Sequence, residues 1–259
     1  MDKFTDVILN RRPMISDHRD YRLVDFLTIA MIKRAAQIDK MEWEVKRILD
    51  QGKTGHCVGY AFAGFGISLP VFDDWNNDMG EKIYYAAKII DWEPNQEDGS
   101  NSRSGVQAFT QFSNLSNYAF ATSIDDIIVW LLTTGPIVGG TNWYDDMFSP
   151  DSDGLVKIGG SIAGGHEWMI SGYDKTTRRF LCTNSWGDSF GIGGQFYIGY
   201  DDYLRLFNEQ GDAVTAVEVG IIPAPITPAP APIPAPSSGP GCMPDGLRKN
   251  IIRILGGLL

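Results

Sequence analysis

The sequence contains few of the residues on which several classes of protein depend. Its three cysteines, Cys57, Cys182 and Cys242, are odd in number and widely spaced. This does not suit a disulfide framework and favours a reducing compartment or free thiols. The three histidines do not cluster with cysteines or carboxylates at zinc-like intervals. We therefore expect no metal site and no cofactor.

Positive charge is also scarce. The 259 residues include 22 lysines and arginines against 32 aspartates and glutamates, which gives a formal net charge of -10. A body of this charge is not suited to wrapping nucleic acid or to lying on an anionic membrane. We expect no nucleic-acid partner.

Long apolar runs are missing as well. Residues 1–21 are dense in charge and contain no apolar stretch of the kind found in a secretory signal. Runs such as 26–32 and 127–132 are far shorter than the about 20 residues that a membrane-spanning helix needs. The sequence predicts a soluble, cytoplasmic protein without a signal peptide or a transmembrane segment.

What is present is an ordinary share of core-forming residues, 43% hydrophobic. Apolar periodicity predicts helices at 24–38, 57–65, 82–90, 105–112 and 124–133. Alternation and turn residues predict strands at 43–49, 137–142, 155–158, 167–173, 179–183, 194–198 and 213–219. A helical half followed by a sheet half indicates the α+β class.

Composition divides the chain into four parts. Residues 1–42 form an N-terminal segment whose helix packs on the core, and residues 43–222 form the main domain. The Pro/Ala-rich stretch 223–240 predicts an extended linker, and residues 241–259 predict an amphipathic helix with three basic residues. The segment 241–259 could dock on a protein partner, bind a membrane surface or be disordered.

A glycine-containing turn brings Cys57 to the first turn of a predicted helix. Residues 50–57 have the sequence DQGKTGHC. The helix dipole and the free backbone N–H groups at a helix start stabilise a thiolate. The same N–H groups can bind an oxyanion, and the carboxamide of Gln51 can supply a second donor. A buried structural cysteine is the competing interpretation.

Two further polar residues lie at the ends of predicted strands. His166 follows a glycine pair and could take a proton from a thiol, and Asn184 could hold the imidazole in position. The indole of Trp186 could shield their hydrogen bond from water. A histidine or an asparagine alone would also be compatible with a structural role.

The ordered set Gln51, Cys57, His166 and Asn184, with NSWG at 184–187, resembles the papain family of cysteine peptidases over about residues 43–219. The resemblance implies a two-lobe α+β fold with a cleft between a helical lobe and a β-sheet lobe. It implies that Cys57 is the nucleophile, His166 its base, Asn184 the residue that orients the imidazole and Gln51 part of the oxyanion hole. The chain is most similar to compact phage and bacterial versions, which adds a virion-associated location to the cytoplasmic one.

The resemblance also implies a polypeptide substrate and residues that bind it. Gly99 and Ser100 precede a predicted helix and are expected to offer backbone groups to an extended substrate. Trp186 and Gly165 are expected to contribute to substrate binding next to the catalytic pair.

The sequence departs from the family pattern in several places. The segment 54–58 is TGHCV where the family has CGSCW, so the usual disulfide is absent, and the charged Glu167 follows the predicted base. Few residues precede Gln51. We therefore expect no long inhibitory propeptide and no regulation by its removal.

Two other functions fit parts of this pattern. A catalytically silent papain-like module could bind a peptide or dock into a larger assembly, such as a phage particle, through its C-terminal segment. A peptidoglycan amidase would share the Cys-His chemistry but is disfavoured, because such enzymes lack the NSWG element.

Overall fold

The computed structural model describes residue 4 and residues 6–92 and 99–218. Its strands are β1 (Tyr21–Arg22), β2 (Lys40–Glu42), β3 (Asn117–Phe120), β4 (Ile137–Tyr144), β5 (Ile162–Asp174), β6 (Arg179–Thr183), β7 (Gln195–Gly199) and β8 (Asp212–Val217). Its α-helices are α1 (Ile29–Ala36), α2 (Cys57–Gly66), α3 (Asn77–Ile90), α4 (Ser102–Phe109), α5 (Ile124–Thr133) and α6 (Tyr200–Gln210). Two short 3-10 helices are η1 (Leu23–Phe26) and η2 (Asp145–Phe148).

The strands form one sheet in the order β1-β3-β8-β4-β5-β6-β7, and β2 pairs with β5 beside this path. β1 and β3 are parallel, and the other pairs are antiparallel. The central strand β4 pairs on both sides, so that its Gly140 lies opposite Glu167 of β5 and also opposite Asp212 of β8. This register places Glu167 and Asp212 on either side of Gly140, one in each neighbouring strand.

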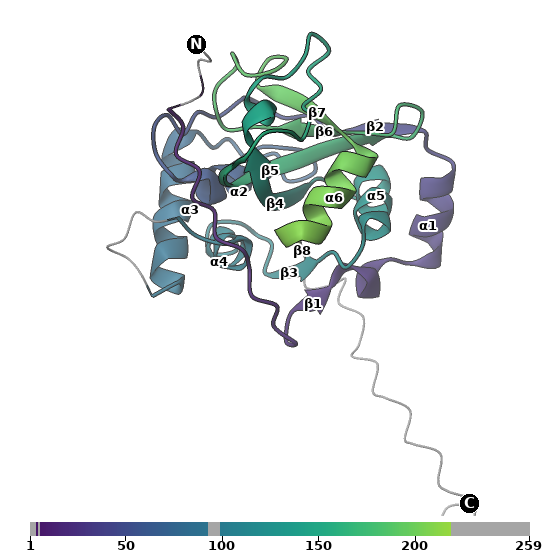
Figure 1. Cartoon of the computed structure of the whole chain (residues 1–259). Coiled ribbons are helices and arrows are strands. Elements are labelled where there is room, and N and C mark those ends of the chain that lie inside the picture. Colours follow the sequence, from purple (N-terminus) through teal and green to yellow (C-terminus); the bar gives the residue numbers. More distant parts are fainter. Residues whose placement is uncertain (1–3, 5, 93–98, 219–259) are drawn as a thin grey trace, which may run out of the picture. The chain divides into compact units, whose positions relative to one another are not determined.

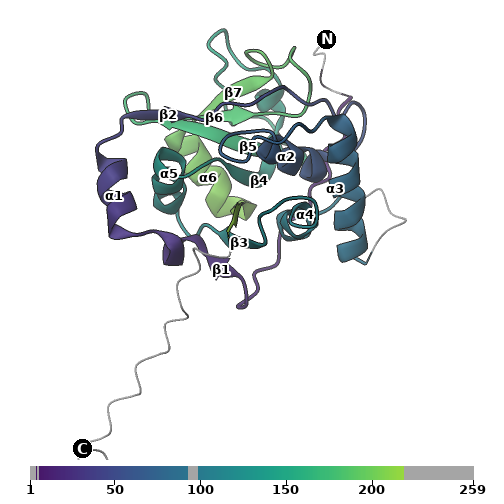
Figure 2. The ribbon, with the colours of Figure 1, turned by 180° about the vertical axis from the view of Figure 1, so that it is seen from behind.

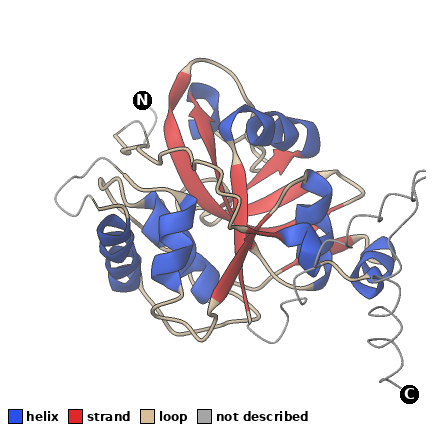
Figure 3. Cartoon of the chain, turned by 90° about the horizontal axis from the view of Figure 1, so that it is seen from below, coloured by secondary structure: helices blue, strands red, loops and turns tan. Residues whose placement is uncertain are grey.

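Helices cover both faces of the sheet. In the opposite views of Figures 1 and 2, α6 stands in front of the central strands in one and α5 in the other. Helices α2, α3 and α4 form a separate group, and Figure 3 shows the strands between the helical layers. Ile137 and Ile170 belong to the core that also contains Tyr203 and Leu206 of α6, whereas Val138 and Met169 belong to the core of the α2 group. Successive side chains of a strand point to opposite faces of the sheet, so neighbouring residues of one strand contribute to two different cores.

The predicted α+β class is confirmed, and several elements have the expected bounds. The helix at 124–133 and the strand at 179–183 match α5 and β6. The strand expected at 43–49 is wrong, because this stretch runs beside the end of α2, where the Lys46 N–H donates to the Ile67 carbonyl (3.1 Å). The strand expected at 155–158 reduces to one bridge between Leu155 and Tyr197. Helix α6 and strand β3 were not predicted.

The N-terminal helix is shorter than the 24–38 expected. Strand β1 and the 3-10 helix η1 lead into α1, which begins after Thr28, whose hydroxyl accepts from the Met31 N–H. Leu23, Phe26 and Ala35 are buried in the core under α5. None of the helices among the described residues has the length and apolar character needed to cross a bilayer. The predicted linker at 223–240 and the helix at 241–259 lie outside the described residues.

Helix α2 contains three glycines, and their surroundings differ. A β-carbon at Gly59 would collide with the backbone of α3 at Gly80, and one at Gly66 would collide with the ring of Trp75. A β-carbon at Gly64 would meet nothing within 4 Å. Close packing therefore accounts for Gly59 and Gly66 but not for Gly64.

Replacing Gly59 with alanine should lower the free energy of unfolding by about 1–3 kcal/mol, because the added methyl group forces α2 away from α3. Gly64→Ala is the matched control in the same helix. It should raise the free energy of unfolding by about 0.5–1 kcal/mol, because alanine favours a helix over glycine. Urea unfolding followed by circular dichroism measures both, and equal effects would contradict the close contact at Gly59.

Candidate active site

Cys57 is the first residue of α2 and is completely buried. The turn before it is tied to the end of β6, since the Gln51 N–H donates to the Ser185 carbonyl (2.8 Å). Burial raises the pKa of the Cys57 thiol to about 12, and the nearby charge of Glu167 adds to this rise. Backbone hydrogen bonds from Glu167 and Val58 act in the opposite direction. In this state Cys57 is a neutral thiol.

His166 lies inside β5 rather than at its mouth, because the strand begins at Ile162. Its Nε2 is 2.8 Å from Oδ1 of Asn184, which directly follows β6. That oxygen also accepts the Ser185 N–H at 2.8 Å, which identifies it as the acceptor atom of the carboxamide. Nε2 of the neutral ring therefore carries the proton, and Nδ1 offers a lone pair.

The Nδ1 atom of His166 is buried and has no hydrogen-bond partner among residues 4, 6–92 and 99–218. No hydrogen bond joins it to the Cys57 sulfur in that part of the chain. The two residues are linked instead through the next residue along β5, since the Glu167 backbone bonds to the sulfur. Burial lowers the pKa of His166 to about 4, against the opposing effect of its bond to Asn184.

Aromatic rings fix the position of the imidazole. Trp186 stacks on His166 with ring centres 4.7 Å apart and an interplanar angle of 26°. Trp143 meets the same ring edge-on at 5.1 Å. Trp186 is itself 4% exposed, so its indole covers the imidazole and its bond to Asn184. The structure places it as a shield within the core, and an open substrate-binding surface at Trp186 is not present in this state.

Gln51 has a fixed orientation next to the turn that leads to Cys57. Its Nε2 donates to the Thr54 carbonyl at 2.7 Å, and its Oε1 accepts from the Ser185 hydroxyl at 2.7 Å. The side chain is buried. One of its two amide protons is committed to Thr54, which leaves the other for an oxyanion.

A short segment of the N-terminus lies across this site. Asn10 forms a parallel bridge with Gly165, the Arg11 N–H donates to the Gly165 carbonyl (2.9 Å) and the Arg12 N–H donates to the Ser100 carbonyl (2.8 Å). In Figure 1 this segment, in dark purple, runs between the α2–α4 group and the sheet. We call residues 9–12 the covering segment. It lies against Gly165, directly before His166, and its Asn10 side chain lies against Gly55, two residues before Cys57.

Glycines make room for the covering segment. A β-carbon at Gly99, where φ is +88°, would collide with the Asn10 carbonyl, and one at Gly165 would collide with the Arg11 carbonyl. The residues Gly99, Ser100 and Gly165, predicted to contact an extended substrate, thus contact an extended strand of the chain itself. The sequence analysis missed this segment, although the glycines of β5 are a signal for close backbone approach.

Arg11 anchors the covering segment inside the protein. Its guanidinium donates to the Asp212 carboxylate and to the Gln210 carbonyl (3.1 Å), and its Nε lies 3.7 Å from Glu167 Oε2. The Ser102 hydroxyl lies within hydrogen-bond distance of both carboxyl groups, at 3.0 Å from Glu167, and can donate its proton to one of them. Burial and the charge of Asp212 raise the pKa of Glu167, and Arg11 opposes this. We call Ser102, Gly140, Glu167 and Asp212 the acidic pocket.

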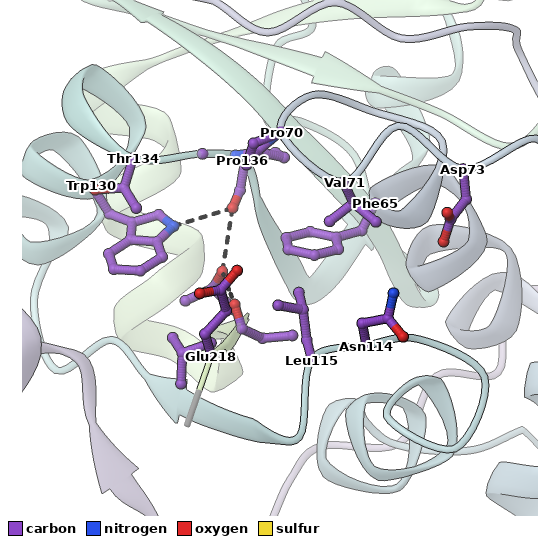
Figure 4. A pocket seen from close by; sticks show the side chains of 14 residues that line it. Phe65, Pro70, Val71, Asp73, Asn114, Leu115, Trp130, Thr134, Pro136 and Glu218 are labelled. Atoms are coloured by element: carbon purple, nitrogen blue, oxygen red, sulfur yellow. Dashed lines mark hydrogen bonds between the residues drawn. The ribbon is translucent and has the colours of Figure 1, made fainter. Parts of the chain in front are cut away.

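A separate cavity of about 290 Å³ lies at the other end of α2 (Figure 4). Phe65, Pro70, Leu115 and Trp130 line it, and the Trp130 indole donates to the Pro136 carbonyl (3.3 Å). Phe65 is eight residues beyond Cys57, which is about 12 Å along a helix. The lining contains no cysteine or histidine. This cavity is therefore not part of the candidate active site.

The expectation of no metal is not contradicted. Within the described ranges, no group of three or more histidine, cysteine, aspartate or glutamate side chains is arranged to hold a metal ion. His56, which precedes Cys57, instead pairs with Glu81 through Nδ1 at 2.8 Å and stacks on Tyr84.

Comparison with known proteins identifies the class. Residues 79–211, just over half of the 259, match the family model of papain family cysteine proteases. The matched residues include His166 and Asn184 and begin after Cys57. The chain therefore belongs to the papain family of cysteine proteases, as the sequence motifs predicted.

Individual relatives resemble parts of the chain. A cathepsin B-like cysteine proteinase 5 of Caenorhabditis elegans is 32% identical over 102 residues, which cover 39% of this chain and 28% of the relative. An uncharacterized peptidase C1-like protein of Acanthamoeba polyphaga mimivirus is 23% identical over 201 residues, covering 59% and 64%. The matches thus span less than two thirds of these relatives.

Solved structures share the fold. Xylellain, a cysteine protease from Xylella fastidiosa, superposes with a TM-score of 0.65 at 21% identity, covering 82% of this chain and 96% of that one. Procathepsin B S9 from Trypanosoma congolense gives a TM-score of 0.59 at 12% identity, covering 82% and 87%. The predicted papain-like architecture is confirmed.

The ring of His166 should titrate with a midpoint near pH 4, because burial lowers its pKa to about 4 from an ordinary 6.5. Between about pH 4 and pH 6.5, His166 is protonated in the unfolded chain but largely neutral in the folded protein. This contribution to stability is present above pH 6.5 and is lost as the pH falls toward 4. The C2-proton NMR signal, assigned with His166→Gln, gives the midpoint, and a value at or above 6.5 would contradict the burial.

Removing the Arg11 side chain should expose Cys57. Arg11→Ala leaves two buried carboxylates without their cation, and such a loss costs about 3–5 kcal/mol, which favours release of the covering segment. We expect alkylation of Cys57 by iodoacetamide to accelerate about tenfold or more. Peptide mapping by mass spectrometry locates the label. Arg19→Ala, at an exposed ion pair with Asp17, is the control and should not change the rate.

Proposed function

We propose that the protein is a cysteine peptidase in which Cys57, His166, Asn184 and Gln51 carry out the hydrolysis of peptide bonds. One observation carries the proposal. The Nδ1 lone pair of His166 is buried and unpartnered, while Asn184 holds the Nε2 proton. A base oriented in this way is what an activated thiol nucleophile requires.

The chemistry follows from these positions. His166 Nδ1 takes the Cys57 proton, and the sulfur attacks the substrate carbonyl carbon. The oxygen that becomes negative is stabilised by backbone N–H groups at the start of α2 and by the free amide proton of Gln51. The C–N bond then breaks, the amine leaves with the proton from the imidazolium, and a thioester remains. Water, deprotonated by His166, releases the acid and restores the thiol.

The state described here is closed, so turnover requires the covering segment to move. Its contacts with Gly165 and Ser100 use the backbone groups that would bind an extended substrate. Movement would bring water to Cys57 and His166, which removes the burial that keeps both neutral. The few residues before Gln51 therefore do not argue against regulation by the N-terminus.

The catalytically silent module is the alternative, and the neutral, buried Cys57 favours it. In that case the covering segment would be a permanent part of the fold. The expected roles of the C-terminal segment in docking on a protein or a membrane surface concern residues outside the described ranges. They stay predictions, as do the four-part division of the chain and its cytoplasmic or virion-associated location.

Hydrolysis should depend on both residues of the pair. Digestion of a fluorescently labelled unfolded protein should fall about a thousandfold or more in Cys57→Ala and in His166→Ala, because either change removes the nucleophilic step. Cys182→Ser is the matched control, since Cys182 is also buried. Its activity should stay within about twofold.

The pH dependence of alkylation separates the two functions. With Arg11→Ala as the host, Cys57 should react well below pH 8.5, and His166→Ala in that host should abolish this. If Cys57 in the opened protein titrates like a free thiol and no protein is digested, the silent module is the better interpretation.

A further inference from the structure

The acidic pocket is constructed from four separate parts of the chain. Gly140 lies on β4 between Glu167 of β5 and Asp212 of β8, and the hydroxyl of Ser102, at the start of α4, lies within hydrogen-bond distance of both carboxyl groups. A β-carbon at Gly140 would stand 2.9 Å from Arg11 Cζ and 2.9 Å from Glu167 Oε2. The glycine is therefore the floor of a pocket that admits a guanidinium.

The pocket contains two carboxyl groups and one arginine, and burial raises the pKa of both Glu167 and Asp212. Two carboxylates face one arginine, and the side chains of Arg11 and Glu167 are both 0% exposed. Buried carboxylates are costly unless a cation and hydrogen bonds compensate them. The four pocket residues alone contain no cation. They are arranged to receive one.

Arg11 fills this pocket incompletely. Within the described part of the chain, Arg11 Nε and Glu167 Oε1 are buried without hydrogen-bond partners. The distance from Arg11 Nε to Glu167 Oε2 is 3.7 Å, longer than a hydrogen bond. A guanidinium that arrived on another backbone could use these unpaired atoms. Arg11 is thus a replaceable occupant rather than an optimal one.

The pocket adjoins the reactive thiol. Glu167 follows His166 on β5, and its backbone bonds to the Cys57 sulfur. Gly165, on the other side of His166, accepts a hydrogen bond from the backbone of Arg11 itself. A peptide that replaced the covering segment would therefore place one side chain in the acidic pocket within a residue or two of its scissile bond.

We infer that the acidic pocket is the subsite that selects substrates carrying a basic side chain, with arginine preferred, and that Arg11 holds this subsite in the closed protein. The inference rests on the proposed peptidase function. The competing interpretation is a purely structural ion cluster that only fastens the N-terminus.

The test compares matched substrates. Fluorogenic peptides carry arginine or norleucine at either of the two residues before the cleaved bond, and the enzymes are the full chain and its Arg11→Ala variant. At one of the two positions, kcat/KM should be at least a hundredfold higher for arginine. Glu167→Gln and Asp212→Asn should each reduce this ratio tenfold or more. Asp201→Asn, which removes an exposed carboxylate, should leave the ratio unchanged.

The outcomes are distinguishable. Cleavage of arginine and norleucine peptides at equal rates overturns the inference and leaves the peptidase function intact. An arginine preference that survives in both Glu167→Gln and Asp212→Asn, with folding checked by circular dichroism, also overturns it. If no peptide is cleaved, isothermal titration calorimetry measures the affinity of the same peptides for the Arg11→Ala variant. Tighter binding of arginine than norleucine supports the pocket, and equal binding overturns it.

Discussion

The contact between the Arg11 guanidinium and the Asp212 carboxylate is the interaction on which the closed arrangement depends. It is buried, Glu167 and Ser102 complete it, and it fastens a segment that otherwise crosses the site mainly through backbone hydrogen bonds. Loss of one member of a buried ion pair leaves an uncompensated charge, which is far more costly than loss of an exposed pair. The buried ion pair of Arg11 with Asp212 thus holds the covering segment in place.

Burial at the candidate site keeps Cys57 and His166 uncharged. With the covering segment in place, burial raises the pKa of Cys57 to about 12 and lowers that of His166 to about 4. Near neutral pH both are uncharged, which is the less reactive state of a thiol. The helix start and the backbone bond from Glu167 favour a thiolate once water enters. Burial is the main cause of the raised pKa of Cys57, and the charge of Arg11 opposes it.

The sequence identified the candidate residues of the site, but it did not predict that an N-terminal segment lies across them. His166 and Asn184 follow from short motifs, and α5 follows from its apolar periodicity. The helix α6 was missed because its apolar residues were assigned to no element. The contact of Arg11 with Asp212 joins residues 201 positions apart, and no local pattern encodes it. The covering segment could be found only from the fold.

If the acidic pocket selects substrate as inferred, the same carboxyl groups fasten the N-terminus and bind the side chain of the substrate. Substrate must compete with Arg11, so its apparent affinity is lowered by the fraction of molecules that are closed. If Glu167 and Asp212 bound a guanidinium more tightly, they would select a basic side chain better, but they would also hold Arg11 in place more firmly. A weaker pair would open the cleft and lose the selection. The distance of 3.7 Å between Arg11 Nε and Glu167 Oε2 is longer than a hydrogen bond, so this contact holds the segment less firmly than the contact of Arg11 with Asp212.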